Sequence, residues 1–195
     1  MKAVVAFGRD HNILICHDNP YSFILNDAPQ SIFNNGGIED DIIELTSLSK
    51  SHNMAGWRVG AMVARQELLA PVIRFKSNMD SGMFKPLQLA AAEALTMDTS
   101  WYDSINAEYR KRRTVAYNLM DTINCTYDEG AAGMFVWAKT DGKSGEEVSD
   151  RLLNDCGVFI TPGMVFGTQG NDYIRISLCS PVEVLSTALN RIKAL

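Results

Sequence analysis

The stretch Ser47-Leu48-Ser49-Lys50, followed by Gly56-Trp57-Arg58-Val59-Gly60, decides how the rest of this 195-residue sequence is interpreted. It comes directly after the apolar run 41–46, which predicts a buried strand. A lysine just past a buried strand, with an arginine in reach, is partly desolvated beside a second cation, and both effects favour the neutral amine. Because a neutral lysine amine can attack a carbonyl carbon, the stretch predicts a Schiff-base lysine.

The same stretch carries groups that bind phosphate. The hydroxyls of Ser47 and Ser49, the glycine amides and the guanidinium of Arg58 are all suitable donors. A Schiff-base lysine beside a phosphate anchor indicates pyridoxal phosphate. Taken alone, a lysine flanked by serines is also typical of a solvated loop, so the interpretation depends on other parts of the chain.

Two charged residues elsewhere fit the same chemistry. Asp18 ends the apolar run 13–17 and could pair with a protonated pyridine nitrogen, although an Asx-turn before Asn19-Pro20 is the alternative. Arg175 lies among apolar residues in the alternating run 173–177. An arginine there needs an anion, either a substrate carboxylate bound by both arms of the guanidinium or the nearby Asp172.

Five ordered elements together resemble the class I and II aminotransferases, which are fold type I pyridoxal-phosphate enzymes. The resemblance spans nearly the whole chain, and its strength comes from the order and spacing of the elements. They are D-x-x-Y at 18–21, S-x-S-K through R-x-G at 47–60, a glycine-aromatic-tryptophan strand at 133–137, a GV…PG..FG loop at 157–167, and an arginine at 175.

The resemblance implies an enzyme that moves an amino group from an amino acid to a 2-oxo acid. Lys50 would hold the cofactor as an internal aldimine and then carry the proton between substrate and cofactor carbons. Asp18 would keep the pyridine nitrogen protonated, and Tyr21 would donate a hydrogen bond to the phenolate oxygen of the ring. The remaining site residues would bind anions: Ser47, Ser49 and Arg58 the phosphate, and Arg175 the substrate α-carboxylate.

The expected fold class is α/β, with two domains. Residues 1–98 would be the C-terminal portion of the cofactor-binding large domain, an open, parallel-type sheet, and 99–195 the small C-terminal domain with a βαββα pattern. The predicted strands are 13–17, 42–46, 59–64, 134–139, 158–161 and 173–178. The predicted helices are 2–11, 66–78, 86–97, 100–123, 145–155 and 181–194.

Capping residues predict where several helices begin and end. Ser144 with Glu147 and Ser180 with Glu183 are typical capping boxes, and Ser100 with Asp103 is a further capping pair. Pro86 suits the first turn of a helix, and Gly157 suits a C-terminal stop.

The family's glycine-rich loop, ring-stacking aromatic residue and ring-hydroxyl asparagine precede the D-x-x-Y element and are not found in this sequence. The sequence therefore corresponds to about the C-terminal half of a complete enzyme. The alternative is a truncated, catalytically inactive fragment of such an enzyme. The resemblance also implies a homodimer, and His52 stands where relatives more often have an aromatic residue.

Composition excludes several other classes of protein. An apolar content of 46% is typical of a globular chain, and the net charge of −5 argues against a nucleic-acid partner. Four cysteines without metal-site spacing and three scattered histidines predict no metal centre. With no signal peptide and no apolar run of membrane-spanning length, the expected location is the cytoplasm.

A serine acyltransferase of the penicillin-binding type is a rival hypothesis. Ser47 to Lys50 also reads as S-x-x-K, 104–106 as S-x-N, and Lys143-Ser144-Gly145 as K-[ST]-G. That chemistry needs the last motif on a strand, whereas here it leads into a predicted helix, so this hypothesis is rejected.

Overall fold

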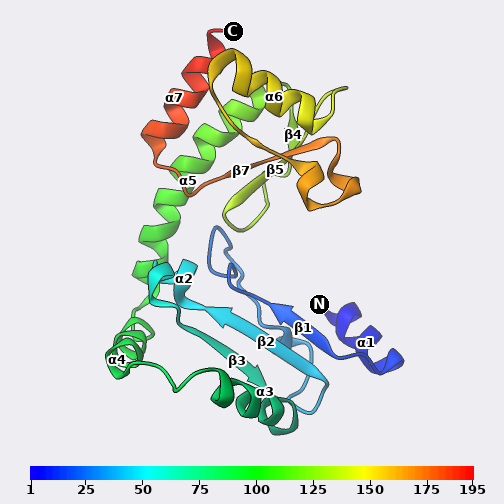
Figure 1. The fold of residues 1–195 in the computed structure, drawn as a ribbon, viewed down its shortest axis with the longest axis vertical. Coiled ribbons are helices and arrows are strands. Elements are labelled where there is room, and N and C mark those ends of the chain that lie inside the picture. The colour runs from blue at the N-terminus through cyan, green and yellow to red at the C-terminus, as the bar shows by residue number, and fades with distance from the viewer. The chain divides into compact units, whose positions relative to one another are not determined.

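The computed structural model describes residues 1–195, which group into two compact units (Figure 1). Unit 1 comprises Met1–Phe23 and Asp27–Tyr102, and unit 2 comprises Ile24–Asn26 and Asp103–Leu195. The sequence predicted a division between residues 98 and 99. In the structure the change of unit falls inside one long helix, α5 (Thr99–Thr122), and a short early segment joins the later unit.

Unit 1 is built on a three-stranded sheet of order β1-β2-β3. The strands are β1 (Ile15–Asp18), β2 (Ile42–Ser47) and β3 (Gly60–Ala64). β1 pairs with β2 in parallel, as predicted, whereas β3 runs antiparallel to β2, so the prediction of a parallel-type sheet is wrong for β3. The physical reason is the length of the connection from β2 to β3. It contains only the single-turn elements 48–51 and 55–57, whereas a parallel strand would need a long crossover connection.

Short helices complete unit 1. They are α1 (Lys2–His11), α2 (Leu48–Ser51), α3 (Gln66–Met79) and α4 (Lys85–Ala94), with the 3₁₀ turns η1 (Ile32–Asn34) and η2 (Ala55–Trp57). α2 and η2 pack on α4 through a small buried cluster, Leu48, Met54, Ala91 and Ala94. No residue of α3 is buried, and its Ile73, Phe75 and Met79 are exposed.

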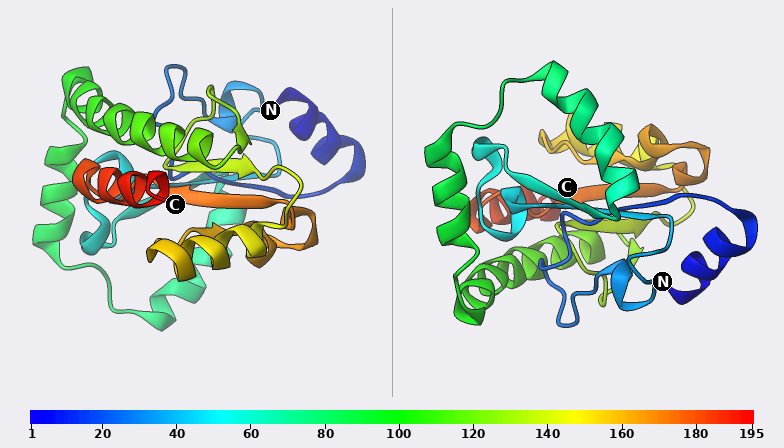
Figure 2. Two further views of the ribbon diagram at one scale, coloured as in Figure 1. Left: turned by 90° about the horizontal axis from the view of Figure 1, so that it is seen from above. Right: turned by 90° about the horizontal axis from the view of Figure 1, so that it is seen from below.

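Unit 2 is a four-stranded antiparallel sheet of order β4-β5-β7-β6, with three helices on one side of it (Figure 2). The strands are β4 (Thr126–Tyr127), β5 (Phe135–Lys139), β6 (Thr161–Pro162) and β7 (Tyr173–Ser177). The helices are α5, α6 (Gly145–Cys156) and α7 (Val182–Lys193), with 3₁₀ turns η3 (Gly163–Phe166) and η4 (Thr168–Gly170). No helix in the structure is both long enough and apolar enough to cross a membrane.

The core of unit 2 follows from the two-residue period of its strands. Val136 and Ala138 of β5 and Ile174 and Ile176 of β7 are buried, while the residues between them are more exposed. They pack against apolar positions of all three helices, which are Ala116, Leu119, Met120, Leu152, Leu185, Leu189 and Ile192. The buried side chain of Ile24 joins the same cluster.

The caps predicted for the two ends of α6 are both present in the structure. The Ser144 hydroxyl accepts from the Glu147 amide at 3.1 Å, and the Glu147 carboxylate accepts from the Ser144 amide at 2.8 Å, which confirms the capping box. Gly157 ends the helix with φ of 64°, in the left-handed region that glycine adopts without strain.

Three other local predictions are wrong. α5 begins at Thr99, near Ser100 as predicted, but Ser100 and Asp103 do not form the capping pair, because the Asp98 carboxylate accepts from the Ser100 amide at 2.9 Å. α7 begins after Pro181 without a side-chain cap, so Ser180 does not form the predicted box. Of the predicted strand 158–161, only Thr161 lies in a strand of the structure. The residues before it form no hydrogen-bonded ladder with a neighbouring strand.

We expect Gly145→Ala to destabilise unit 2. A Cβ atom at Gly145 would lie 1.9 Å from the carbonyl oxygen of Tyr173, and both backbones are fixed because the Gly145 amide donates to the Asn171 carbonyl at 2.7 Å. Overpacking of this kind against backbone costs about 3 kcal/mol. Urea denaturation followed by tryptophan fluorescence measures the loss. The control is Gly130→Ala, where the new Cβ meets only the flexible Asp128 carboxylate; equal stability of the two variants would contradict the prediction.

Candidate active site

Lys50 lies in the four-residue helix α2 that directly follows strand β2. Ser47 caps this turn, because its hydroxyl oxygen accepts from the Ser49 amide at 3.1 Å. Lys50 is half-buried, and its ammonium makes no hydrogen bond or ion pair within the structure. Ser49 contributes its amide to the cap, while its side-chain hydroxyl makes no hydrogen bond.

Arg58 lies at the opposite side of the same turn, where the chain enters β3. It ends η2 with φ of 55° and ψ of 43°, a left-handed conformation that is uncommon for a residue other than glycine. Backbone strain of this kind persists only where the surroundings fix it, and it gathers at functional sites. Ser47 pairs with Gly60 across β2 and β3, so the serine, the lysine turn and Arg58 meet at one end of the two strands.

Asp18 lies at the neighbouring strand end. β1 and β2 run in parallel with Asp18 opposite Leu45, so the carboxyl ends of both strands reach the same edge of the sheet. The Asp18 side chain is exposed and makes no hydrogen bond, so the Asx-turn alternative is wrong. Tyr21 follows in the loop after β1, and its side chain is 37% exposed.

Arg175 belongs to unit 2, in the middle of β7. Its guanidinium carbon lies 4.2 Å from the ring centre of Phe135 and 4.0 Å from that of Phe166, so the cation is held between two aromatic faces. It makes no ion pair, and the alternative of a salt bridge to Asp172 is therefore wrong. Stacking fixes the plane of the guanidinium and leaves its N–H groups for an anion.

Comparison with known proteins decides the family. The family model for aminotransferase class I and II matches residues 1–192. The chain belongs to the class I and II aminotransferases. The LL-diaminopimelate aminotransferases of Gloeobacter violaceus and Aquifex aeolicus are 37% and 36% identical to it, over 99% and 100% of this chain but 50% and 51% of their own length.

Solved structures of other proteins have the same fold. Apo-BacF from Bacillus subtilis superposes with a TM-score of 0.90 at 30% identity, covering 99% of this chain and 52% of that one. A probable N-succinyldiaminopimelate aminotransferase from Thermus thermophilus superposes with a TM-score of 0.88 at 29% identity, covering 99% of this chain and 52% of that one. This family member therefore spans about half the length of the relatives it matches.

Family membership agrees with the local structure around the rival motif. Lys143 and Ser144 form the capping turn that leads into α6, and Gly145 is the first residue of that helix. The K-[ST]-G strand that an acyltransferase needs does not exist here.

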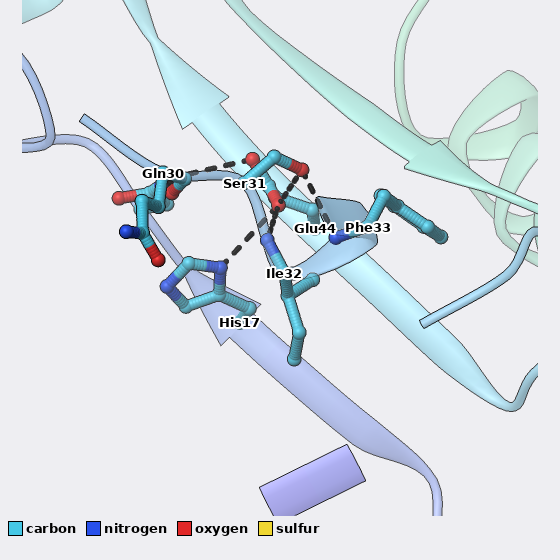
Figure 3. A network of polar contacts seen from close by, with 7 residues as sticks. His17, Gln30, Ser31, Ile32, Phe33 and Glu44 are labelled. Carbon is cyan, nitrogen blue, oxygen red and sulfur yellow. Dashed lines mark hydrogen bonds and ion pairs between the residues drawn. The ribbon is translucent and has the colours of Figure 1, made fainter. Parts of the chain in front are cut away.

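One buried polar network in this family member was not predicted from the sequence (Figure 3). Glu44 of β2 is 9% exposed and accepts from the Ser31 hydroxyl at 2.7 Å, the Ile32 amide at 2.8 Å and the Asn19 amide group at 3.3 Å. Burial raises the pKa of Glu44, but the hydrogen bonds from Ser31 and Ile32 outweigh it and lower the pKa overall. The ionised carboxylate of Glu44 thereby holds Ser31 and Ile32, at the start of η1, and Asn19, which follows Asp18, against β2.

A signal for this network was present in the sequence. Glu44 is the one charged residue inside an otherwise apolar strand, and His17 is opposite it in the register of β1 and β2. The two side chains approach to 3.4 Å on the sheet face opposite to Asp18. A buried carboxylate needs several donors, so it predicts a polar loop packed over that face.

Proposed function

We propose that this chain forms the lysine-bearing part of a pyridoxal-phosphate-dependent aminotransferase, which moves an amino group from an amino acid to a 2-oxo acid. The observation that carries the proposal is the pair of unpartnered groups at adjacent strand ends. The ammonium of Lys50 and the carboxylate of Asp18 both lack a partner within the structure. The two groups come from neighbouring parallel strands, whose carboxyl ends reach the same edge of the sheet, where ligands of α/β proteins bind.

The donor set fits the cofactor. Lys50 offers the amine that attaches to an aldehyde, and Asp18 offers the carboxylate that holds a proton at a pyridine nitrogen. Ser47, Ser49 and Arg58 offer donors for a phosphate, and Tyr21 a donor for a phenolate oxygen. When bound, pyridoxal phosphate supplies an electron sink for the charge that develops at the substrate α-carbon. Lys50, once free, is the base that takes the α-proton and returns it.

The substrate class follows from Arg175 and from the relatives. An unpaired, stacked guanidinium suits the α-carboxylate of an amino acid or a 2-oxo acid. Relatives at 37% and 36% identity are LL-diaminopimelate aminotransferases, so we propose LL-diaminopimelate as the first amino donor to assay. A panel of amino acids at equal concentration, scored by kcat/KM, ranks it against simpler donors.

We expect Arg175→Lys to raise KM for amino acids about ten-fold with a much smaller effect on the fold. Lysine keeps the charge but loses the planar, two-armed geometry and its stacking between Phe135 and Phe166. Steady-state kinetics and thermal denaturation measure the two effects. The matched control is Arg151→Lys on the exposed surface of α6. An unchanged KM with a lowered melting temperature would make Arg175 a structural residue.

We further propose that unit 1 is part of the cofactor-binding domain, that unit 2 is the small domain, and that the protein is a cytoplasmic homodimer. Large exposed apolar side chains on and beside α3 and α4 support association, since monomers rarely expose a group of this size. They include Ile73, Phe75, Met79, Phe84 and Leu89. Sedimentation equilibrium measures the oligomeric state.

Absorbance titration tests the function. The purified chain is titrated with pyridoxal phosphate, and the visible band of a lysine-bound cofactor is followed before and after borohydride. A saturable band that borohydride removes, together with amino-group transfer, supports the enzyme. The absence of both in the 195-residue polypeptide would favour the alternative, a catalytically inactive fragment of such an enzyme.

A further inference from the structure

A buried histidine follows directly after the lysine turn. His52 is 6% exposed and forms the C-cap of α2, with its amide bonded to the Leu48 carbonyl at 3.2 Å. Its Nδ1 lies 2.8 Å from Oγ of Ser51, and its Nε2 lies 3.2 Å from the hydroxyl of Tyr102. Tyr102 belongs to the first turns of α5, 50 residues further along the chain.

The donors fix the direction of the bond between Ser51 and His52. Oγ of Ser51 also lies 3.2 Å from the carbonyl oxygen of Ser47, which can only accept, so the serine proton points there. Ser51 must then accept from Nδ1–H of His52. Nε2 of His52 lies within hydrogen-bond distance of the Tyr102 hydroxyl, so the chain of bonds runs from Tyr102 through His52 and Ser51 to Ser47.

The surroundings of the ring disfavour a charged imidazole. Burial lowers the pKa of His52, and a hydrogen bond to the Ala94 carbonyl opposes that shift only in part. The groups that face the ring are hydroxyls and a backbone carbonyl, from Ser51, Tyr102 and Ala94. None of them carries a charge that would stabilise an imidazolium ion.

The first turn of α5 holds the lysine turn by its main chain as well. Nε1 of Trp101 donates to the carbonyl oxygen of Ser51 at 3.0 Å. The ring of Tyr102 meets His52 edge-on, with centres 5.6 Å apart, and stacks on Phe23 with centres 5.0 Å apart. Two neighbouring residues of α5 therefore fix the carbonyl end of α2.

We propose that His52 is a positioning residue for Lys50, which acts by tying both ends of the α2 turn to the first turn of α5. The proposal rests on the proposed role of Lys50. Its physical basis is that the ammonium of Lys50 has no partner of its own, so the backbone of the turn sets the point and direction from which its flexible side chain extends. Ser47 and Ser51 bracket Lys50, and both belong to the hydrogen-bond chain that His52 completes.

Hydrogen exchange of the unliganded chain tests the coupling without any cofactor. The variants are His52→Phe, Tyr102→Phe and the double variant, which keep the aromatic contacts but remove the hydrogen bond. The amides of residues 52 and 54, both bonded to the Leu48 carbonyl, should exchange about five-fold faster in each single variant. The double variant should be no faster than the faster single one, because both changes break the same chain.

The matched control is Tyr127→Phe, which removes a tyrosine hydroxyl bonded to Asp121 at 2.9 Å in unit 2. It should leave exchange at 48–54 unchanged. Unchanged exchange there in both His52→Phe and Tyr102→Phe would overturn the proposal, since His52 would then act only as a packing residue.

The kinetics of the cofactor-loaded enzyme provide a second test of the role proposed for His52. His52→Phe should lower kcat about five-fold and leave KM within about two-fold, because the amine is misplaced while the substrate-binding groups are not. Faster exchange without a fall in kcat would overturn the positioning role and leave the proposed function standing. A protein that never forms the visible band in any variant would refute the proposed function, while the exchange result would still report on the turn.

Discussion

Replacing Lys50 by alanine is expected to abolish the visible band of bound cofactor and to reduce amino-group transfer by at least about four orders of magnitude. One side chain supplies both the nucleophile that attaches the cofactor and the base that moves the α-proton. No other lysine of unit 1 follows a strand in this way, because Lys2, Lys76 and Lys85 lie on exposed helical positions. Absorbance and single-turnover kinetics measure the two losses.

Lys85→Ala is the matched control for this experiment. Lys85 is exposed at the start of α4 and belongs to the same unit, so its removal changes the charge equally without touching the turn. It should retain the band. A band that survives in Lys50→Ala, or a borohydride-reduced peptide that contains a different lysine, would exclude Lys50.

Asp18→Asn is expected to retain cofactor binding but to slow α-proton abstraction about 100- to 1,000-fold. An amide cannot hold a proton on a pyridine nitrogen as a carboxylate does, so the ring accepts electrons less well. The substitution preserves shape, and the Asp18 side chain makes no hydrogen bond within the structure that the change could break. Exchange of the substrate α-proton with deuterated solvent measures the step directly.

Asp10→Asn on the exposed face of α1 serves as the control, because it removes the same charge at a distance from the strand ends. Near-normal proton exchange in Asp18→Asn would show that the residue is structural. Loss of cofactor binding in the same variant would instead make its role that of an anchor.

The features predicted correctly from the sequence depend on residues close together in the chain. The capping box of Ser144 and Glu147 spans three residues, and the alternation of β7 is visible in the run 173–177 alone. The strand and turn around Lys50 are equally local. In each case the residue types that indicate the element are neighbours in the chain, although the ladders of β2 and β7 pair them with strands elsewhere in the sequence.

The features that were missed depend on partners distant in the sequence. The direction of β3 depends on how a connection folds, not on the composition of the strand. The donors to Glu44 lie 12, 13 and 25 residues before it, and Arg175 is held between rings from two other elements. The sequence identified Lys50, Asp18 and Arg175 as charged candidates. That each lacks an opposite charge could be learned only from the fold.

The segment Ile24–Asn26 has a consequence for the order of folding. Ile24 is 1% exposed in the core of unit 2, and the Leu25 amide donates at 2.7 Å to the side chain of Asn106, 81 residues later. Closing a loop of that length costs roughly 4 kcal/mol of chain entropy. During synthesis Ile24 emerges long before its partners and must remain unburied until they follow. If a protease cut the chain within unit 1 between these residues, refolding from the unfolded fragments would make this closure a bimolecular step, so unit 2 would refold at a rate that depends on concentration.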